Sequence, residues 1–359
     1  MRITSVSCNS FRCLKQIEWE LDDGFSVVRG NNAQGKTSLL ECIQYAITSK
    51  SHRTSKDSDL IAHESLGFSI RISGLRQGRE VTLEAFTHNG AKRFKVNGVA
   101  QTKVSDILGK LHVVFFSPED VRLVQGSASD RRQFMDMELS QIHNDYLNAL
   151  QQYRLVLRQR NEILRSRKFD PELLKSWNPQ LVQHGTHLMN YRARFIVELS
   201  ELAAKAYSSI ADGEILEVSY APSIQSVEDF ETVLGNSLES DIRRQSTGKG
   251  PHRDDITISI SGQPARSHAS QGQQKSTSLA LKLAELELVH RRIGEYPILM
   301  LDEVLAELDE DRSRELFLSI PESVQCLVTT TERDAGRLGL AREWSEFEIN
   351  CGRLEKIEG

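Results

Sequence analysis

A glycine-rich segment, Gly30 to Thr37, reads GNNAQGKT and lies between the apolar stretch Phe25 to Arg29 and a helical pattern that begins at Leu39. It matches G-x-x-x-x-G-K-[ST], in which glycines let backbone N–H groups close around phosphates and the helix N-terminus adds a favourable dipole. Lys36 is expected to reach the β- and γ-phosphates, and Thr37 to ligate magnesium. The sequence therefore predicts a site for ATP and Mg2+. The residues expected to line it are Gly30, Asn31, Asn32, Ala33, Gln34, Gly35, Lys36 and Thr37.

Two carboxylates, Asp302 and Glu303, end the apolar run Pro297 to Leu301. Such a run indicates a fully buried parallel strand. Asp302 is then placed to hold Mg2+ through water, and Glu303 to orient or deprotonate an attacking water as general base. A buried strand whose end is merely solvated by acids is the structural alternative. The presence of GNNAQGKT in the same chain favours the catalytic interpretation.

A polar segment, Ser270 to Lys275, precedes a strongly amphipathic helix just before the acidic strand. Serine before a helix is usually an N-cap, which is the structural interpretation. A helix N-terminus also suits an anion, which is the functional one.

Composition places the chain among ordinary soluble proteins: 359 residues with 39% hydrophobic and 26% charged content, enough for two lobes. No apolar run approaches the ~20 residues that span a bilayer, so we expect a cytoplasmic protein without membrane contact. The cysteines are odd in number and form no C-x-x-C pair, which favours reduced thiols.

The net charge of −5 argues against a globally basic nucleic-acid binder, so any DNA contact must use local basic groups. A solvated helix face is the alternative for the helical arginines, and a salt bridge to Asp254 or Asp255 is the alternative for Arg253. The DNA-binding candidates are Arg131, Arg132, Arg154, Arg158 and Arg253; the wider basic groups add Arg160, Arg165, Arg167, Lys168, Arg243, Arg244 and Lys249.

Periodicity predicts an α/β fold. Alternating strands with the turn pairs Asn89-Gly90 and Asn97-Gly98 indicate a mixed, partly antiparallel sheet in residues 1–120. Two apolar stripes at helical spacing, Ile142 to Leu157 and Leu181 to Leu202, indicate two antiparallel helices in a mainly helical lobe, 121–265. Residues 266–359 are expected to complete the first lobe. The stripes are too short for a long coiled coil.

These motifs together resemble an ABC-type ATPase head of the chromosome-maintenance class. Gly30 to Thr37 corresponds to Walker A, Ser270 to Lys275 to the signature loop, Leu299 to Glu303 to Walker B, and Ala306 to Asp309 to the D-loop. Within that class the chain resembles the bacterial RecF family through NSFRCL, FFSPEDVRLVQG followed by RRQF, GKGPHRDD and LDEVLAELD. The short helical lobe agrees, since relatives outside this family carry long coiled coils.

The resemblance implies a homodimer formed on DNA with ATP, in which Ser270 of one copy contacts the γ-phosphate held by the other; Gly272 and Gln273 are further nucleotide-binding candidates. It implies a role in recombinational repair, replication and the SOS response, loading recombinase at single-strand gaps with the partner proteins RecO and RecR. Hydrolysis is expected to be weak, DNA-dependent and to act as a switch. Arg12 is a further candidate for contact with the nucleotide.

Some positions depart from the class. The switch position reads Thr329-Thr-Thr-Glu332 without the usual histidine, and the Q-loop glutamine is sought within Ser117 to Gln125. The nucleotide-binding subunit of an ABC transporter is the main alternative. The helical insertion after Leu139 disfavours it, and the absence of long coiled coils disfavours a nuclease-associated ATPase.

Overall fold

The protein is described from a computed structural model. The structure describes all residues except 55, 167–170, 212, 305–309, 332–343 and 358–359, so the expected D-loop, Ala306 to Asp309, and Glu332 lie outside the described residues. The chain divides into two compact units. Unit 1 comprises Met1–Asp120 and Glu285–Gly359, and unit 2 comprises Val121–Ala284.

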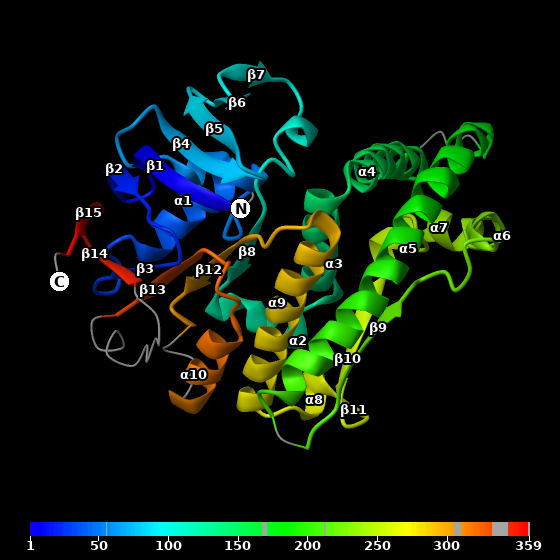
Figure 1. The fold of residues 1–359 in the computed structure, drawn as a ribbon. Helices are drawn as coiled ribbons and strands as arrows, with labels where there is room; N and C mark the ends of the chain where they lie inside the picture. The colour runs from blue at the N-terminus through cyan, green and yellow to red at the C-terminus, as the bar shows by residue number, and fades with distance from the viewer. Residues whose placement is uncertain (55, 167–170, 212, 305–309, 332–343, 358–359) are drawn as a thin grey trace. The chain divides into compact units, whose positions relative to one another are not determined.

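Unit 1 contains an antiparallel sheet in the order β2-β1-β4-β5-β6-β7 (Figure 1). Its hairpins turn at Asn89-Gly90 and Asn97-Gly98, where both asparagines and both glycines have positive φ, as tight hairpin turns require. The alternating strands and the two turn pairs expected in this part of the chain are therefore confirmed. The strands are β1 (Arg2–Phe11), β2 (Leu14–Glu20), β4 (Gly67–Arg76), β5 (Arg79–His88), β6 (Ala91–Val96) and β7 (Val99–Gln101).

A second sheet of unit 1, in the order β15-β14-β3-β13-β12-β8, is parallel except for β15. Buried residues occupy every position of β8, β12 and β13, as expected for parallel strands covered on both faces. The carboxyl ends of β3 and β12 therefore meet at one edge. The strands are β3 (Phe25–Arg29), β8 (Val113–Phe116), β12 (Ile298–Asp302), β13 (Cys326–Thr330), β14 (Trp344–Asn350) and β15 (Arg353–Lys356).

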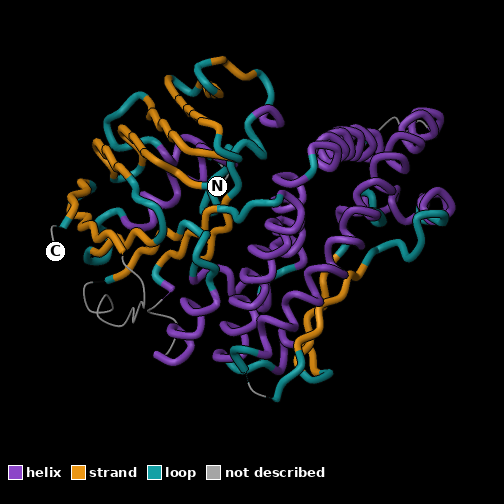
Figure 2. The backbone as a smooth tube through the Cα atoms, in the orientation of Figure 1, coloured by secondary structure: helices purple, strands orange, loops and turns teal. Residues whose placement is uncertain are grey.

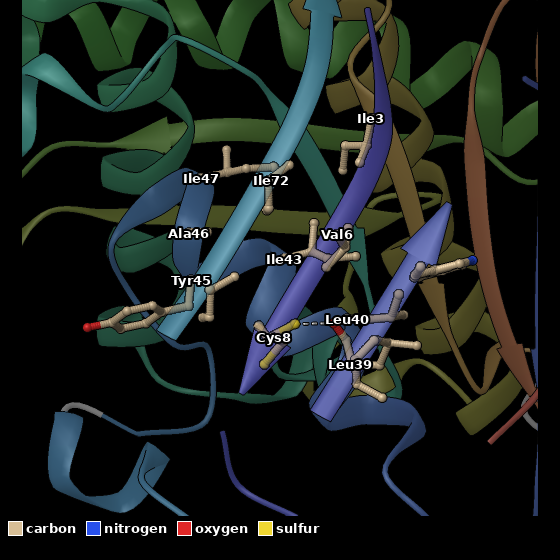
Figure 3. Packing of buried hydrophobic residues seen from close by; sticks show 14 of the residues in the cluster. Ile3, Val6, Cys8, Leu39, Leu40, Ile43, Tyr45, Ala46, Ile47 and Ile72 are labelled. Carbon is tan, nitrogen blue, oxygen red and sulfur yellow. Dashed lines mark hydrogen bonds between the residues drawn. The ribbon is translucent and has the colours of Figure 1, made fainter. Parts of the chain in front are cut away.

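Helix α1 (Lys36–Thr48) contacts strands of both sheets and is buried along its whole length except at Thr37. A helix covered on all sides belongs to the core of its domain. Figure 3 shows its side chains, among them Leu40 and Ile43, packed with Val6 of β1 and Ile72 of β4. The core thus fixes the axis of the helix that begins at the phosphate-loop motif.

Unit 2 is mainly helical, with a small antiparallel sheet, β11-β10-β9 (Figure 2). The two expected antiparallel helices are α4 and α5, which pack on each other. Helix α5 begins at Pro171 and contains Pro179, whereas the sequence pattern placed its start after Pro179. The elements are α2 (Arg122–Gln125), α3 (Ala128–Ile142), α4 (Asn144–Arg165), α5 (Pro171–Ser208), β9 (Leu216–Ala221), α6 (Phe230–Asn236), α7 (Leu238–Arg244), β10 (Asp255–Ile260), β11 (Gln263–Pro264) and α8 (Ala265–His268).

The second boundary between the units falls after Ala284, not after residue 265 as expected. Helix α8, which precedes the signature segment, packs on α2, β10 and β11 of unit 2. The long helix α9 (Gln271–Ile293) contains the boundary. The remaining helices are η1 (Asp57–Leu60), η2 (Val104–Asp106), η3 (Pro118–Val121), η4 (Pro251–Arg253) and α10 (Glu310–Ser319). Among the described residues, no helix combines the length and apolar character needed to cross a membrane.

Candidate nucleotide-binding site

The segment Gly30 to Gly35 leaves β3 and leads into the N-terminus of α1. Gly35 adopts φ +116°, a conformation that favours glycine, and a Cβ on Gly30 would lie 2.5 Å from the carbonyl oxygen of Ile349. No side chain caps α1, and its first turn carries no acidic residue. Its first N–H groups are therefore left for an anion, as the motif predicts.

The ammonium of Lys36 lies beneath this loop. Its side chain is only 3% exposed, and Nζ donates to the carbonyl oxygens of Gly30 at 2.7 Å and Asn31 at 3.0 Å. The Oε1 atom of Glu303 lies 3.1 Å from the same Nζ. The structure therefore brings together the two residues expected to act on the γ-phosphate.

Asp302 ends β12 and is 4% exposed. Its Oδ1 accepts a hydrogen bond of 2.6 Å from Thr329 Oγ1, and Thr37 is a second hydrogen-bond partner. Burial raises the pKa of Asp302 above its ordinary value, because removal from water disfavours the charged form. A dication at this carboxylate would offset that cost. The hydroxyl and carboxylate oxygens of Thr37 and Asp302 are hard ligands of the kind Mg2+ prefers, so the residues fit the ion.

Glu303 has φ +49°, which is uncommon for a residue with a side chain. Its backbone N–H is held by Thr329, at 3.2 Å from the carbonyl oxygen and 3.1 Å from Oγ1. Strained backbone of this kind clusters at functional sites. Here it directs the Glu303 carboxylate toward Lys36.

The turn at Cys351 and Gly352 supports the phosphate loop. The sequence did not predict this contact. Cys351 donates its N–H to Gln34 Oε1 at 2.7 Å, and Gly352 donates to the Gln34 carbonyl oxygen at 3.1 Å. A Cβ on Gly352 would lie 2.2 Å from the carbonyl oxygen of Cys13, and φ at Gly352 is +73°. The residue pair Cys351-Gly352 between two alternating stretches was a usable hairpin signal, but its contact with Gln34 was not foreseeable.

Arg12 hydrogen-bonds residues of unit 1. Its Nε and Nη2 donate to Glu41 of α1 at 2.9 and 2.7 Å, and Nη1 donates to the carbonyl oxygen of Asp59 at 3.1 Å. Glu41 is fully buried, so the pair anchors the β1–β2 turn on α1. Contact between Arg12 and a nucleotide stays a prediction.

The signature segment begins α9 with a reciprocal cap. Gln273 N–H donates to Ser270 Oγ at 3.2 Å, and Ser270 N–H donates to Gln273 Oε1 at 2.8 Å. Gln273 also donates to Glu214 at 2.6 Å, and Ser270 is exposed beside the half-exposed Gly272. Ser270 therefore acts as the N-cap of α9. The contact of Ser270, Gly272 and Gln273 with a nucleotide stays a prediction. Gln125 of α2, from the stretch searched for the Q-loop, hydrogen-bonds Gln274.

Burial divides the basic residues of unit 2. Arg131 is 5% exposed, and its Nε and Nη2 donate to Asp255 at 2.6 and 2.9 Å. Arg131 is therefore removed from the candidate DNA contacts, because its guanidinium is buried and held. Arg154 is exposed but donates to Asp136 at 2.8 Å, and Arg158 is exposed. Both stay predictions.

Arg160, from the wider basic group, is fully buried. Arg167 and Lys168 of that group lie outside the described residues.

Comparisons with known proteins extend the resemblance to the whole chain. The family described as RecF/RecN/SMC N terminal domain matches residues 2–339. A DNA replication and repair protein RecF from Shouchella clausii (strain KSM-K16) is 38% identical over 373 residues, covering 100% of both chains. The chain belongs to the RecF family.

A solved structure described as the recombination mediator RecF with ATP in the RecFOR pathway shares the RecF-family fold of this chain. Its TM-score is 0.91 at 31% identity, covering 99% of this chain and 97% of that one. An Smc head bound to the C-winged helix domain of ScpA has a TM-score of 0.58 at 15% identity, covering 99% and 97%, and shows the fold alone. The expected ATPase-head α/β fold is thereby confirmed.

Proposed function

We propose that the chain binds ATP with Mg2+ at the phosphate loop and acts as a DNA repair and recombination mediator. The observation that carries the nucleotide assignment is the buried Lys36 ammonium, held under the loop at 3.1 Å from Glu303. The uncapped start of α1 and the Thr37–Asp302 pair support it. Full-length RecF relatives support the role in repair.

Each residue then has a defined task. Lys36 exchanges its present partners for the β- and γ-phosphates, while N–H groups of the loop and of α1 bind the remaining oxygens. Thr37 and Asp302 would hold Mg2+, which neutralises charge on the phosphates. Glu303, once released by Lys36, would orient the attacking water. Hydrolysis in this scheme is slow and resets the protein.

The site on one chain is incomplete in this proposal, because Ser270 of a second copy would contact the γ-phosphate. Two ATP molecules would then join two heads on gapped DNA, and hydrolysis would release them. We further propose work in the cytoplasm with RecO and RecR to load recombinase, since the structural relative is described within the RecFOR pathway. A transporter subunit finds no support, because the full-length relatives are RecF proteins.

Light scattering with and without Mg-ATP tests the switch. The wild type is expected to double its mass with ATP, and Lys36→Met to stay monomeric because the phosphates lose their buried cation. A wild type that binds ATP yet remains monomeric would refute dimerisation. Electrophoretic mobility of gapped duplex, with and without ATP, tests the DNA role independently; no shift at low salt would refute it.

A further inference from the structure

The loop from Gln245 to Asp255 in unit 2 is fixed at its start by a buried ion pair. Arg160 Nη1 donates to Asp241 Oδ2 at 2.8 Å and to Thr247 Oγ1 at 2.6 Å, and both charged side chains are buried. Asp241 Oδ1 accepts from the N–H of Gly248 at 2.9 Å. These bonds hold the backbone at Thr247 and Gly248.

The end of the loop is held by a second buried pair. Asp254 is fully buried and accepts from Arg192 Nη1 at 3.0 Å and from the N–H of Ser223 at 2.9 Å. Arg192 also donates to the carbonyl oxygen of Pro251 at 2.7 Å. Buried ion pairs add little net stability over apolar residues, so their main consequence here is a defined loop position.

The middle of the loop is equally constrained. A Cβ on Gly250 would lie 2.5 Å from the Tyr153 hydroxyl, and φ there is +127°. His252 Nε2 donates to the Thr247 carbonyl oxygen at 2.9 Å, so Nδ1 accepts from Tyr153 at 2.7 Å. Burial lowers the pKa of His252 to about 4, which keeps the ring neutral in this arrangement.

Two arginines at this loop, Arg132 of α3 and Arg253 of the loop itself, form no salt bridge among the described residues. Arg132 Nη1 donates to the Asp254 carbonyl oxygen at 2.7 Å, and Arg253, which is exposed, donates to the Thr247 carbonyl oxygen at 3.5 Å. The neighbouring carboxylates are engaged: Asp255 pairs with Arg131, and Asp254 with Arg192. Arg253 therefore does not form the salt bridge with Asp254 or Asp255 that their positions in the sequence suggested.

Charges of both signs surround Arg132, and two of the cations, Arg192 and Arg253, repel it. Burial, followed by the charge of Arg192, lowers the pKa of Arg132; the carboxylates of Asp255 and Asp254 act in the opposite direction, and Arg253 lowers it further. Lys249 is a further exposed cation of the same loop. An anion bound here would relieve the repulsion between cations, and the loop would not need to rearrange to receive it.

We propose that Arg132 and Arg253 form a site for the phosphate backbone of DNA on unit 2. The inference rests on the proposed DNA-binding function and names the residues that carry it. Guanidinium groups bind phosphate through paired hydrogen bonds, and a fixed backbone sets their spacing. A chain with a net charge of −5 needs such a local excess of cations to hold a polyanion.

The test is the salt dependence of binding to a fluorescent gapped duplex, followed by anisotropy with ATP present. Arg132→Gln with Arg253→Gln is expected to weaken binding about ten-fold and to reduce the slope of log K against log salt by about two, one per lost phosphate contact. Arg253→Lys is expected to keep most of the slope, because it keeps the charge. Arg194→Gln, which removes an exposed arginine from α5, is the matched control and should leave the slope unchanged.

Thermal unfolding and ATP titration establish that each variant is folded. A double variant that is folded but keeps the wild-type slope would overturn the site, while the proposed function stands. Equal losses in Arg194→Gln would also overturn it, because the effect would then be general charge. A wild type that fails to bind the duplex would instead overturn the proposed function itself.

Discussion

Replacing Glu303 by glutamine removes the carboxylate that pairs with Lys36. In the proposed function, the γ-phosphate of ATP has to displace that carboxylate. Lys36 is buried and Glu303 is one-third exposed, with 3.1 Å between Nζ and Oε1. Exposed pairs contribute ~0.2–1 kcal/mol and breaking a buried pair costs ~3–5 kcal/mol, so we expect the half-buried pair to contribute about 1–2 kcal/mol. For a unit of this size the loss lowers Tm by about 2–8 °C.

ATP binding should change in the opposite direction. The γ-phosphate has to replace the Glu303 carboxylate on the Lys36 ammonium, and the carboxylate repels it. Removing that charge is expected to tighten ATP binding about 5–30-fold, the factor that corresponds to 1–2 kcal/mol. The same variant should lose hydrolysis, because the general base is gone.

Calorimetric titration with Mg-ATP and thermal unfolding of the protein without ATP measure the two effects. Glu346→Gln is the control, since Glu346 also lies 3.1 Å from its partner, Arg29, but both side chains are partly exposed. We expect a cost below ~1 kcal/mol there and no change in affinity. Glu303→Gln with unchanged Tm and unchanged affinity would refute the reasoning.

Three further changes test other parts of the structure. Gly352→Ala should lower both Tm and ATP affinity, since its Cβ would meet a backbone carbonyl at 2.2 Å, whereas Gly90→Ala, with similar φ but open space, should cost only ~1–2 kcal/mol and leave affinity unchanged. Asp302→Asn should raise Tm at neutral pH without Mg-ATP, because the raised pKa of Asp302 means that its ionised form destabilises the folded state. Differential scanning calorimetry from pH 7 to pH 4 should show this advantage of the variant fading as the wild-type carboxyl becomes protonated. A difference in Tm that does not depend on pH would contradict this cause. Arg160→Ala should cost about 3–5 kcal/mol in urea unfolding by leaving a buried aspartate unpaired, while the exposed Arg158→Ala should stay within ~0.5 kcal/mol; equal effects would contradict the assignment.

Local patterns predicted the parts of the site that neighbouring residues determine. The strand Phe25–Arg29 has the bounds that its apolar run indicates, and Asp302 ends a buried strand as expected. Thr37 and Asp302 are hydrogen-bonded, although 265 positions separate them, because parallel strands bring their carboxyl ends to one edge. A strand-loop-helix motif and a buried acidic strand are therefore sufficient to predict this pairing.

Features that depend on distant partners escaped prediction. Arg131 and Arg253 both stand beside other charged residues in the sequence, yet one is buried against Asp255 and the other is exposed. The charges along the sequence do not show which arginine the fold will pair with a carboxylate. Unit 2 extends to Ala284, whereas the sequence pattern suggested a helical lobe ending at residue 265, and its α8 packs on α2 and β10.

The order of the second sheet also governs when the site can form during synthesis. Strand β3 pairs with β13 and β14, which leave the ribosome about 300 residues later, or ~15–60 s at ordinary elongation rates. During that interval the nascent chain presents an apolar strand with both edges unpaired, a state that invites aggregation or chaperone binding. The turn at Gly352 that supports the phosphate loop emerges later still. Prematurely terminated chains would therefore retain the complete phosphate-loop motif and yet lack the strands that give it its shape.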